Sequence, residues 1–186
     1  VSTQKFGTLC QWAIQAINLV TGNLDNVGGM LFPEPAIDLV RRKSIQGKAT
    51  YGEFHSRVSG LPSFAGELPV AALLEEITTP GDGQIRAMFV AAGNPVLSVP
   101  NGEKLSKALA GLDFMVAMDF YVNETTRHAH IILPPTHYLA HDHYDLIFHH
   151  FAVRNTVCYS SAVFEKNPNE RHDWEIYEAL ANALAD

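Results

Sequence analysis

The sequence predicts a three-layer α-β-α fold, in which helices cover both faces of a doubly wound, mostly parallel β-sheet. Apolar runs suited to buried strands occur at Ile85–Ala92, Asp113–Asp119 and His130–Leu133. Helical patterns lie between these runs, and the connections are short. Parallel strands require such crossovers, and the crossovers are almost always right-handed. These observations place the chain in the α/β class, with a Rossmann-like arrangement of strands and helices.

Composition and charge limit the possible partners. The 186 residues are 47% apolar and 18% charged, as in ordinary globular domains with a buried core. The formal net charge is −7, which argues against nucleic acid or an anionic membrane as the main partner. No apolar run reaches the roughly 18 residues that span a bilayer. We therefore expect no nucleic-acid partner and no membrane insertion, and by default a cytoplasmic location.

The two cysteines carry little chemical information. Cys10 and Cys158 are far apart in the sequence, and neither belongs to a CxxC-type cluster. A disulfide framework or a cysteine metal site is therefore not expected. We expect two buried thiols.

Residues 1–67 form a less regular N-terminal part of a single domain, 1–186. Apolar residues at helical spacing predict a helix over Gln11–Val20, ended by Gly22 in a left-handed conformation. Asp25–Pro35 contains glycines and prolines and is expected to be a loop. Arg41–Ser63 has weak periodicity, and we expect it to be mobile or dependent on a partner. The chain starts at Val1 without an initiator Met, so we expect this start to be cut rather than native.

Residues 68–186 hold a βαβαβ core followed by a His-rich loop and a C-terminal helix. The predicted core helices are Leu68–Ile77, Glu103–Ala110 and Glu124–Ala129. In the second of these, Leu105, Ala108 and Leu109 should face the core. Pro80–Gly83 is expected to be a turn.

The C-terminal third continues with a polar loop over His137–His150. Phe151–Tyr159 is expected to be a strand or an extended cover. Asp173–Leu184 is predicted to be an amphipathic helix, with acids in the first turn where the helix dipole favours them. Its inward face is predicted to carry Trp174, Tyr177, Leu180, Ala181 and Leu184.

The ends of the predicted strands carry the candidate ligand site. In open α/β sheets, ligands bind beyond the carboxyl ends of the strands. Gly93 allows close approach of the backbone to a ligand, Asn94 offers a donor and an acceptor, and Pro95 stiffens the exit. Asp119 could accept two N–H donors from a purine, or a ribose hydroxyl. An alternative stays open, in which Gly93–Pro95 is only a turn and Asp119 caps a helix from Asn123.

Other chemistries have weaker signals. GxGxxG, GxxxxGK[ST] and GxSxG motifs are absent, which disfavours the usual dinucleotide, P-loop and hydrolase sites. Histidines are dense between His128 and His150, and His141-Asp142-His143 resembles a metal-ligand run. Pro134-Pro135 and the polar composition favour a loop, either solvated or facing a cofactor, over a metal site.

A series of short motifs resembles the molybdopterin oxidoreductase family of dimethyl sulfoxide reductase, formate dehydrogenase and nitrate reductases. The family patterns are close to "LNLLTGN…PGG", "QDxFxxETAxxADVVLP" and "DWxI". The matching segments, in order along nearly the whole chain, are Asn18–Leu24 with Gly28-Gly29, Ile85–Ala87, Gly93–Pro95, Met118–Thr126, His128–Pro134 and Asp173–Ile176. Any one motif is weak, but the ordered series is specific.

The resemblance implies a scaffold role inside a larger enzyme. Family catalytic subunits bind molybdenum through two pterin guanine dinucleotides, and the part resembled here holds one guanosine and diphosphate arm and lines the substrate funnel. By resemblance, Gly93, Asn94 and Pro95 contact the nucleotide arm, and Asp119 hydrogen-bonds guanine or ribose. Gln4, in a Thr3-Gln4 pair, reaches toward the pterin. The implied cofactor is therefore molybdopterin guanine dinucleotide, bound in the full-length parent and expected to be absent from this chain alone.

The departures from the family pattern concern the catalytic centre. No iron–sulfur cysteine cluster and no molybdenum ligand occur in their usual context. His130 replaces the Asp of "ADVVLP", and His141–Tyr144 replaces the common "EKxGTFTN" segment. We therefore expect no catalytic or metal-binding residue and no activity in isolation. The implied partners are the parent's iron–sulfur domain and C-terminal pterin-binding domain.

Two alternatives remain from the residues alone. One is a stand-alone nucleotide-binding module that uses the strand-end site. The other is a metal-binding protein or small hydrolase that uses the His-rich loop. The substrate of a parent enzyme, and the choice of molybdenum or tungsten, depend on residues outside this sequence.

Overall fold

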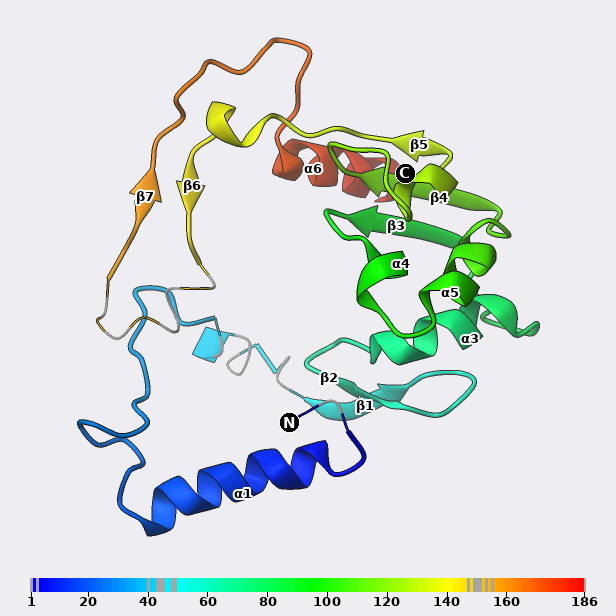
Figure 1. The fold of residues 1–186 in the computed structure, drawn as a ribbon. Helices are drawn as coiled ribbons and strands as arrows, with labels where there is room; N and C mark the ends of the chain where they lie inside the picture. Colours follow the sequence, from blue (N-terminus) through cyan, green and yellow to red (C-terminus); the bar gives the residue numbers. More distant parts are fainter. Residues whose placement is uncertain are drawn as a thin grey trace. The chain divides into compact units, whose positions relative to one another are not determined.

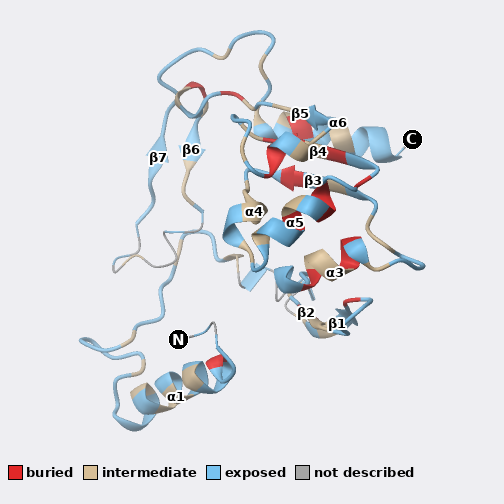
Figure 2. Cartoon of the chain, turned by 45° about the vertical axis from the view of Figure 1, so that its right-hand side comes forward, coloured by how far each residue is buried: buried red, intermediate tan, exposed pale blue. Residues whose placement is uncertain are grey.

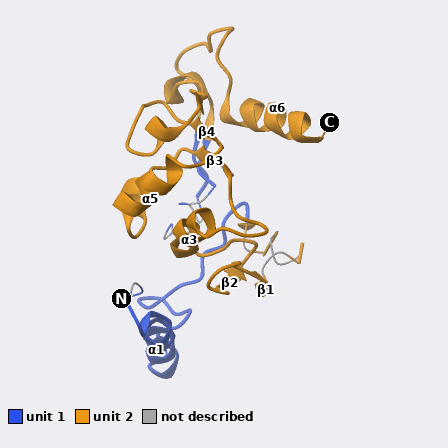
Figure 3. Cartoon of the chain, turned by 90° about the vertical axis from the view of Figure 1, so that its right-hand side faces the viewer, with its two compact units in different colours: residues 1–38, 144–159 blue, residues 39–143, 160–186 orange. Residues whose placement is uncertain are grey.

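The computed structural model describes residues 2, 4–39, 41–42, 46–47, 50–146, 148, 152, 154 and 156–185. They divide into two compact units, which Figure 3 shows in different colours. Unit 1 comprises residues 1–38 and 144–159, and unit 2 comprises residues 39–143 and 160–186. The sheet that the sequence predicts belongs to unit 2.

A parallel sheet of three strands, in the order β3-β4-β5, lies in the described part of unit 2 (Figure 1). Each residue of β3 (Ala87–Ala91) pairs with one in β4 (Phe114–Met118), and β5 (Ile131–Ile132) pairs with the middle of β4. The strands lie within the three predicted segments and are shorter than predicted. The mixed α/β class and the parallel strands are thereby confirmed.

The core lies between this sheet and two helices, α3 (Leu73–Thr78) and α5 (Gly102–Leu109). Figure 2 shows the buried residues concentrated in these elements. The cluster consists of Ile77, Val90, Leu105, Ala108, Leu109, Leu112 and Met115. The three α5 residues predicted to face inward are all buried, as a helical apolar stripe requires. Each fully buried leucine contributes about 1.5–3 kcal/mol of transfer free energy.

The C-terminal helix α6 (Asp173–Ala185) forms where predicted, but with a different inward face. Its Tyr177 ring meets Phe89 of β3 edge-on, with 5.8 Å between the ring centroids. Ile176 is buried at 6% exposure, whereas Trp174 and Leu184 are exposed. The predicted face is therefore wrong at these two positions and at Ala181, which is also exposed. Apolar residues occur around much of the helix, and tertiary contacts select the buried side.

Several short elements differ from the predicted helices. The segment 68–77 starts with a 3-10 turn η1 (Val70–Ala72), because Pro69 is extended at φ −57° and ψ 127°. The segment 124–129 is a single 3-10 turn, η2 (Thr126–His128). A short helix that was not predicted, α4 (Pro95–Ser98), follows β3 with proline at its first position, where the missing N–H costs nothing.

The stretch Arg41–Ser63, which has no clear sequence pattern, contains an antiparallel hairpin. It pairs β1 (Tyr51–His55) with β2 (Pro62–Phe64). Carboxylates of α3 hold its connecting turn, because Glu76 accepts the Val58 N–H at 3.1 Å and the Arg57 Nε–H at 3.3 Å. Residues 43–45 and 48–49 lie outside the described residues.

Unit 1 contains the helix α1 (Gly7–Val20), which starts earlier than predicted. Gly22 follows it in the predicted left-handed conformation, with φ +71°. The helix is poorly covered, since Trp12 and Val20 are 67% and 80% exposed.

A two-stranded sheet joins β6 (His143–Tyr144) to β7 (Tyr159–Ser160), at the end of the predicted extended segment. His149, His150 and Phe151 lie outside the described residues.

The cysteines are free, as the absence of a disulfide framework predicted. Cys10 is half-buried and Cys158 is exposed, so the expectation of two buried thiols is wrong for Cys158. Within the described residues, no helix combines the length and the apolar character needed to cross a membrane.

Candidate functional site

The carboxyl ends of β3 and β4 lie side by side. Ala91 pairs with Met118 in the parallel ladder, and the next residue, Ala92, donates its N–H to the Met118 carbonyl at 2.9 Å. The loops that start at Gly93 and at Asp119 therefore leave the same edge of the sheet. Pro134–Thr136 continues from β5, and the buried Thr136 hydroxyl has no hydrogen-bond partner among the described residues.

The turn after β3 has an unusual backbone at Ala92 rather than at Gly93. Ala92 has φ +49°, in the left-handed region that costs a non-glycine residue about 1–2 kcal/mol. Gly93 has no such φ, and a Cβ built on it would lie 3.6 Å from the nearest chain atom, which is ordinary contact. The protein's own backbone and packing therefore do not require glycine at position 93. A glycine at this position leaves the backbone without a Cβ, so another group could approach it closely.

Asn94 connects the two loops through its side-chain amide. Its Nδ2 donates to Glu124 Oε2 at 2.8 Å, and its Oδ1 accepts from Thr125 Oγ1 at 2.6 Å. Its backbone carbonyl accepts the N–H groups of Leu97 and Ser98, which starts α4. Residues about thirty positions apart in sequence are thus brought together at the strand ends.

Asp119 uses both carboxylate oxygens inside its own loop. Oδ1 accepts the Tyr121 N–H at 3.2 Å, and Oδ2 accepts Asn123 Nδ2 at 2.9 Å. Asn123 Oδ1 in turn accepts the N–H groups of Thr125 and Thr126, each at 2.9 Å. Asn123 therefore holds the backbone N–H groups at the start of the 3-10 turn η2, and Asp119 orients Asn123. A carboxylate has about four lone-pair sites, so Asp119 retains acceptor capacity for a ligand.

Glu124 was not among the residues singled out from the sequence. The side-chain hydrogen bond from Asn94 holds the pKa of Glu124 below its ordinary value, with further lowering from its own backbone N–H and from Arg127. The exposed Glu124 carboxylate is therefore ionised at neutral pH. The only sequence signal for it was its place beside Thr125 in the "ET" of the family pattern.

Gln4 belongs to unit 1, whereas the other four predicted site residues belong to unit 2. Its Nε2 donates to Cys10 Sγ at 3.1 Å, and its Oε1 accepts the Phe6 N–H at 3.2 Å. Both ends of this side chain thus make local contacts at the start of α1. The strand-end site consists of Gly93, Asn94, Pro95 and Asp119, joined by Glu124 and Thr125.

The histidines of the His-rich loop have mainly structural contacts in the described residues. His137 Nδ1 accepts the Leu139 N–H at 3.2 Å and caps the 3-10 turn η3 (Tyr138–Ala140). An open pocket of about 390 Å³ is lined by His141, His143 and their neighbours. Within the described residues, no group of three or more His, Cys, Asp or Glu side chains could hold a metal ion.

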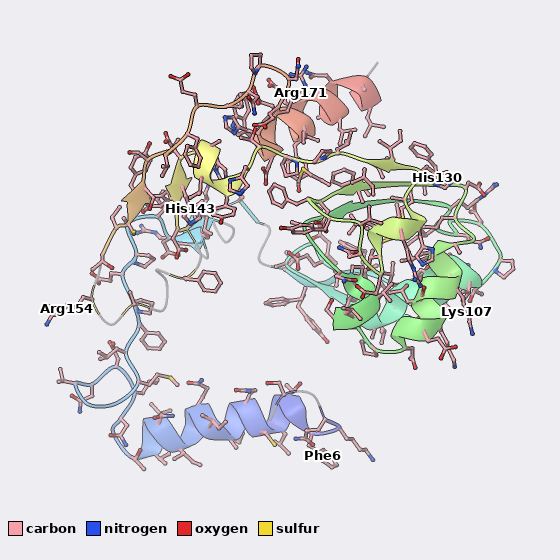
Figure 4. All side chains as sticks on the ribbon, turned by 45° about the horizontal axis from the view of Figure 1, so that its top comes forward. Phe6, Lys107, His130, His143, Arg154 and Arg171 are labelled. Carbon is pink, nitrogen blue, oxygen red and sulfur yellow. The ribbon has the colours of Figure 1, made fainter. Side chains whose placement is uncertain are left out.

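His130 has a specific role in the sheet, close to the start of β5 (Figure 4). Its Nδ1 accepts the Met115 N–H at 3.0 Å, and its own N–H donates to the Met115 carbonyl at 2.8 Å. Met115 is 0% exposed, so its N–H has no access to water. The imidazole thus supplies the acceptor at a position where the family pattern has Asp.

Comparison with known proteins identifies the chain's family. The model of the molybdopterin oxidoreductase family matches residues 1–183. The chain belongs to the molybdopterin oxidoreductase family. The resemblance seen in the sequence motifs is thereby confirmed, and the family implies a molybdopterin cofactor.

Three relatives are named as a reductase, a dehydrogenase and an oxidoreductase, and each is much longer than this chain. The assimilatory nitrate reductase catalytic subunit of Bacillus subtilis is 36% identical over 103 residues, which cover 55% of this chain and 14% of that subunit. A putative formate dehydrogenase of Staphylococcus aureus is 23% identical over 201 residues, covering 100% of this chain and 19% of the relative. A probable oxidoreductase of Bacillus subtilis is 28% identical over 112 residues, covering 59% and 16%. The chain thus spans under a fifth of these relatives.

Proposed function

We propose that this chain is a cofactor-binding scaffold domain of a larger molybdopterin oxidoreductase and is inactive by itself. The observation that carries this proposal is the strand-end edge of unit 2. There Asn94 and Asp119, from separate loops, are held in one hydrogen-bond network next to Gly93, where a Cβ would find room. Ligands of open α/β sheets bind at this edge. Residues 1–186 would act as one domain of the parent, with the less regular part at 1–67.

We also propose that the complete fold is Rossmann-like, with three α-β-α layers around a doubly wound sheet. Helices α3 and α5 pack beside Val90 on one face of β3, and Tyr177 of α6 contacts Phe89, which points to the other face. This arrangement supports helices on both faces. The three described parallel strands follow chain order, so a reversal of strand order would involve further strands of the parent.

The chemistry of the site suits the guanosine part of a molybdopterin guanine dinucleotide. Asn94 would offer both a donor and an acceptor to the base or ribose, and Pro95 would fix the exit of the loop. Asp119 and Glu124 bring negative charge to this edge, which favours N–H and O–H donors over phosphate oxygens. The diphosphate would therefore lie toward Gly93 and away from these carboxylates.

The remaining roles belong to the parent enzyme. The bound molybdenum–pterin group supplies the redox chemistry, while the protein binds and orients it. Gln4 would reach toward the pterin once its local contacts to Cys10 and Phe6 are exchanged. The proposed partners are the iron–sulfur and C-terminal pterin-binding domains, and the chain would line part of the substrate funnel. Two relatives are named for nitrate and for formate, and the residues that would select the parent's substrate lie outside this sequence.

Nucleotide titration of this chain, followed by ¹⁵N–¹H NMR, tests the proposal. GDP is expected to shift resonances at the strand ends, including Gly93 and Asn94, more than ADP does. Binding should be weak, with a dissociation constant of roughly 1 mM or more, because a scaffold domain contributes only part of the site. Asp119→Asn should reduce the preference for guanine, because it removes one carboxylate oxygen.

The matched control is Asp113→Asn. Asp113 precedes β4, whereas Asp119 follows it, so the two substitutions make the same chemical change at opposite ends of one strand. Asp113→Asn should leave the GDP response unchanged. Shifts spread over the whole chain, or equal responses to GDP and ADP, would contradict a guanosine site at this edge.

A further inference from the structure

Asn94 has two fixed neighbours that differ in hydrogen-bonding capacity. Glu124 is exposed and accepts from Asn94 Nδ2, whereas Thr125 is 0% exposed and donates to Asn94 Oδ1. Both neighbours come from the loop after β4, and Asn94 comes from the loop after β3. We propose that Glu124 and Thr125 are positioning residues that lock the orientation of the Asn94 amide and thereby determine which edge of it a nucleotide meets.

The identity of the neighbours permits one orientation of the amide. An ionised carboxylate only accepts hydrogen bonds, so it must face the NH₂ group of Asn94. The Thr125 hydroxyl already accepts the Val96 N–H at 3.1 Å, and its proton is directed to Asn94 Oδ1. A flipped amide would place its oxygen against the Glu124 carboxylate and its NH₂ against the hydroxyl proton. The contact with the Glu124 carboxylate would be repulsive, and the Thr125 hydroxyl proton would have to turn away and lose Asn94 Oδ1 as its acceptor.

The lock is itself held rigidly. Asn123 Oδ1 accepts the backbone N–H of Thr125. Asn123 is held in turn by Asp119, whose Oδ2 accepts a hydrogen bond from Asn123 Nδ2. Thr125 is fully buried, so its hydroxyl cannot exchange these partners for water. The groups facing Glu124 are Asn94, its own backbone N–H and the Arg127 charge, and all three favour the ionised carboxylate. Its negative charge, on which the lock depends, is therefore maintained at neutral pH.

The Asn94 amide, held in this orientation, keeps a defined set of hydrogen-bonding groups for a ligand. After these two bonds, the described residues leave Asn94 with one amide N–H and one carbonyl lone pair. A freely flipping amide would present donor and acceptor in either order, and would discriminate poorly between nucleotide edges. The lock thus gives Asn94 a fixed donor–acceptor pattern. This inference rests on the proposed nucleotide site for its purpose, but the lock itself can be tested without a ligand.

The ligand-free test is the ¹⁵N relaxation of the Asn94 side-chain amide. In the unsubstituted chain the order parameter should approach that of rigid backbone amides, about 0.85, and in Thr125→Val it should fall toward about 0.6 or lower. Thr125→Ser keeps the hydroxyl and should restore the rigid value. Glu124→Leu should behave like Thr125→Val, and Glu124 is exposed, so this variant should fold normally. An order parameter unchanged in Glu124→Leu and Thr125→Val would overturn the lock.

A pH titration adds a readout that a purely structural role would not give. The Asn94 NH₂ shifts should follow ionisation of Glu124, with a midpoint below the ordinary glutamate pKa. As pH falls through that midpoint the carboxylate is protonated, and the amide should become more mobile. Glu124→Gln should abolish this titration. Glu103→Gln, at an exposed glutamate of α5 paired with Lys107, should leave it intact. A titration that persists in Glu124→Gln would contradict the inference.

The ligand arm uses GDP and ADP as probes. Glu124→Leu should lower the ratio of GDP to ADP affinity at least about threefold, which corresponds to the loss of a fraction of one hydrogen bond. In an Asn94→Ala background, Glu124→Leu should cause no further loss. Additive losses would show that Glu124 acts on the ligand directly, which would overturn its positioning role. If the unsubstituted chain binds neither nucleotide while Asn94 remains rigid, the proposed function fails and the lock stands.

Discussion

Ala92 and Gly93, at the end of β3, differ in what the fold requires of them. The left-handed conformation falls on Ala92, where a side chain is strained, and not on Gly93. A glycine without a steric or conformational need in the free protein is consistent with space reserved for a ligand. The sequence pointed to Gly93 for this reason, but it gave no sign of the strain at Ala92.

We predict that Gly93→Ala leaves folding intact and impairs ligand binding. The added Cβ meets chain atoms at no less than 3.6 Å, so the free energy of unfolding should change by under about 0.5 kcal/mol. The GDP-dependent shifts at the strand ends should nevertheless be lost, because the methyl group occupies the space of the ligand. Urea denaturation and NMR titration provide the two measurements. A destabilisation above about 1 kcal/mol would instead assign Gly93 to the fold.

The site residues differ in how far they could be predicted. The positions of Asn94 and Asp119 could be predicted, because polar residues directly after buried apolar runs lie at the carboxyl edge of a parallel sheet. Glu124 was not, because its partner Asn94 is 30 residues away in sequence and nothing local signals the bond. The conformation of the loop after β4 also had to be known before Asn123, rather than Asp119, could be recognised as the side chain that binds the N–H groups at the start of η2.

The pairing of β4 with β5 shows a side chain completing a secondary-structure element. β5 has two residues in the ladder, and His130 precedes it. Its Nδ1 provides the acceptor for the Met115 N–H, where an extended strand would use a backbone carbonyl. The sequence showed His130 as a departure from the family pattern, and the structure gives that histidine an acceptor role.

We predict that His130→Leu destabilises the chain by about 1–3 kcal/mol, because the buried Met115 N–H loses its partner. His130→Asp, which restores the residue of the family pattern, keeps an acceptor and should cost less than half as much. The midpoint of urea denaturation measures both. Equal destabilisation by the two substitutions would show that packing against Phe114, whose ring centroid lies 5.5 Å from that of His130, dominates instead.

At the scale of the whole molecule, apolar surface is distributed unevenly between the two units. In unit 2, β3, β4, α3 and α5 share one buried cluster. In unit 1, α1 carries exposed apolar side chains along its length, including Trp12, Ile17 and Val20. A helix of this length is marginal without tertiary packing. The stability of the chain by itself should therefore reside mainly in unit 2.

We predict that hydrogen exchange separates these regions. Amides of α1 should exchange at least on the order of a hundredfold faster than those of β3 and β4, because opening α1 exposes little buried surface. The β1–β2 hairpin, tied to α3 through Glu76, should be intermediate. Mass spectrometry of exchanged peptides at neutral pH provides the measurement. Equal protection of α1 and the sheet would contradict this distribution of stability.

The sequence by itself determined the α/β class, the positions of the three parallel strands, the inward face of α5 and the family. Each of these follows from local periodicity or from ordered motifs, which need no knowledge of distant contacts. The tertiary structure decided which side of α6 is buried, that Arg41–Ser63 contains a hairpin, and that Asn94 is fixed by Glu124 and Thr125. These depend on contacts between residues far apart in the chain, where several faces or partners are equally compatible with the local pattern, and only packing selects one.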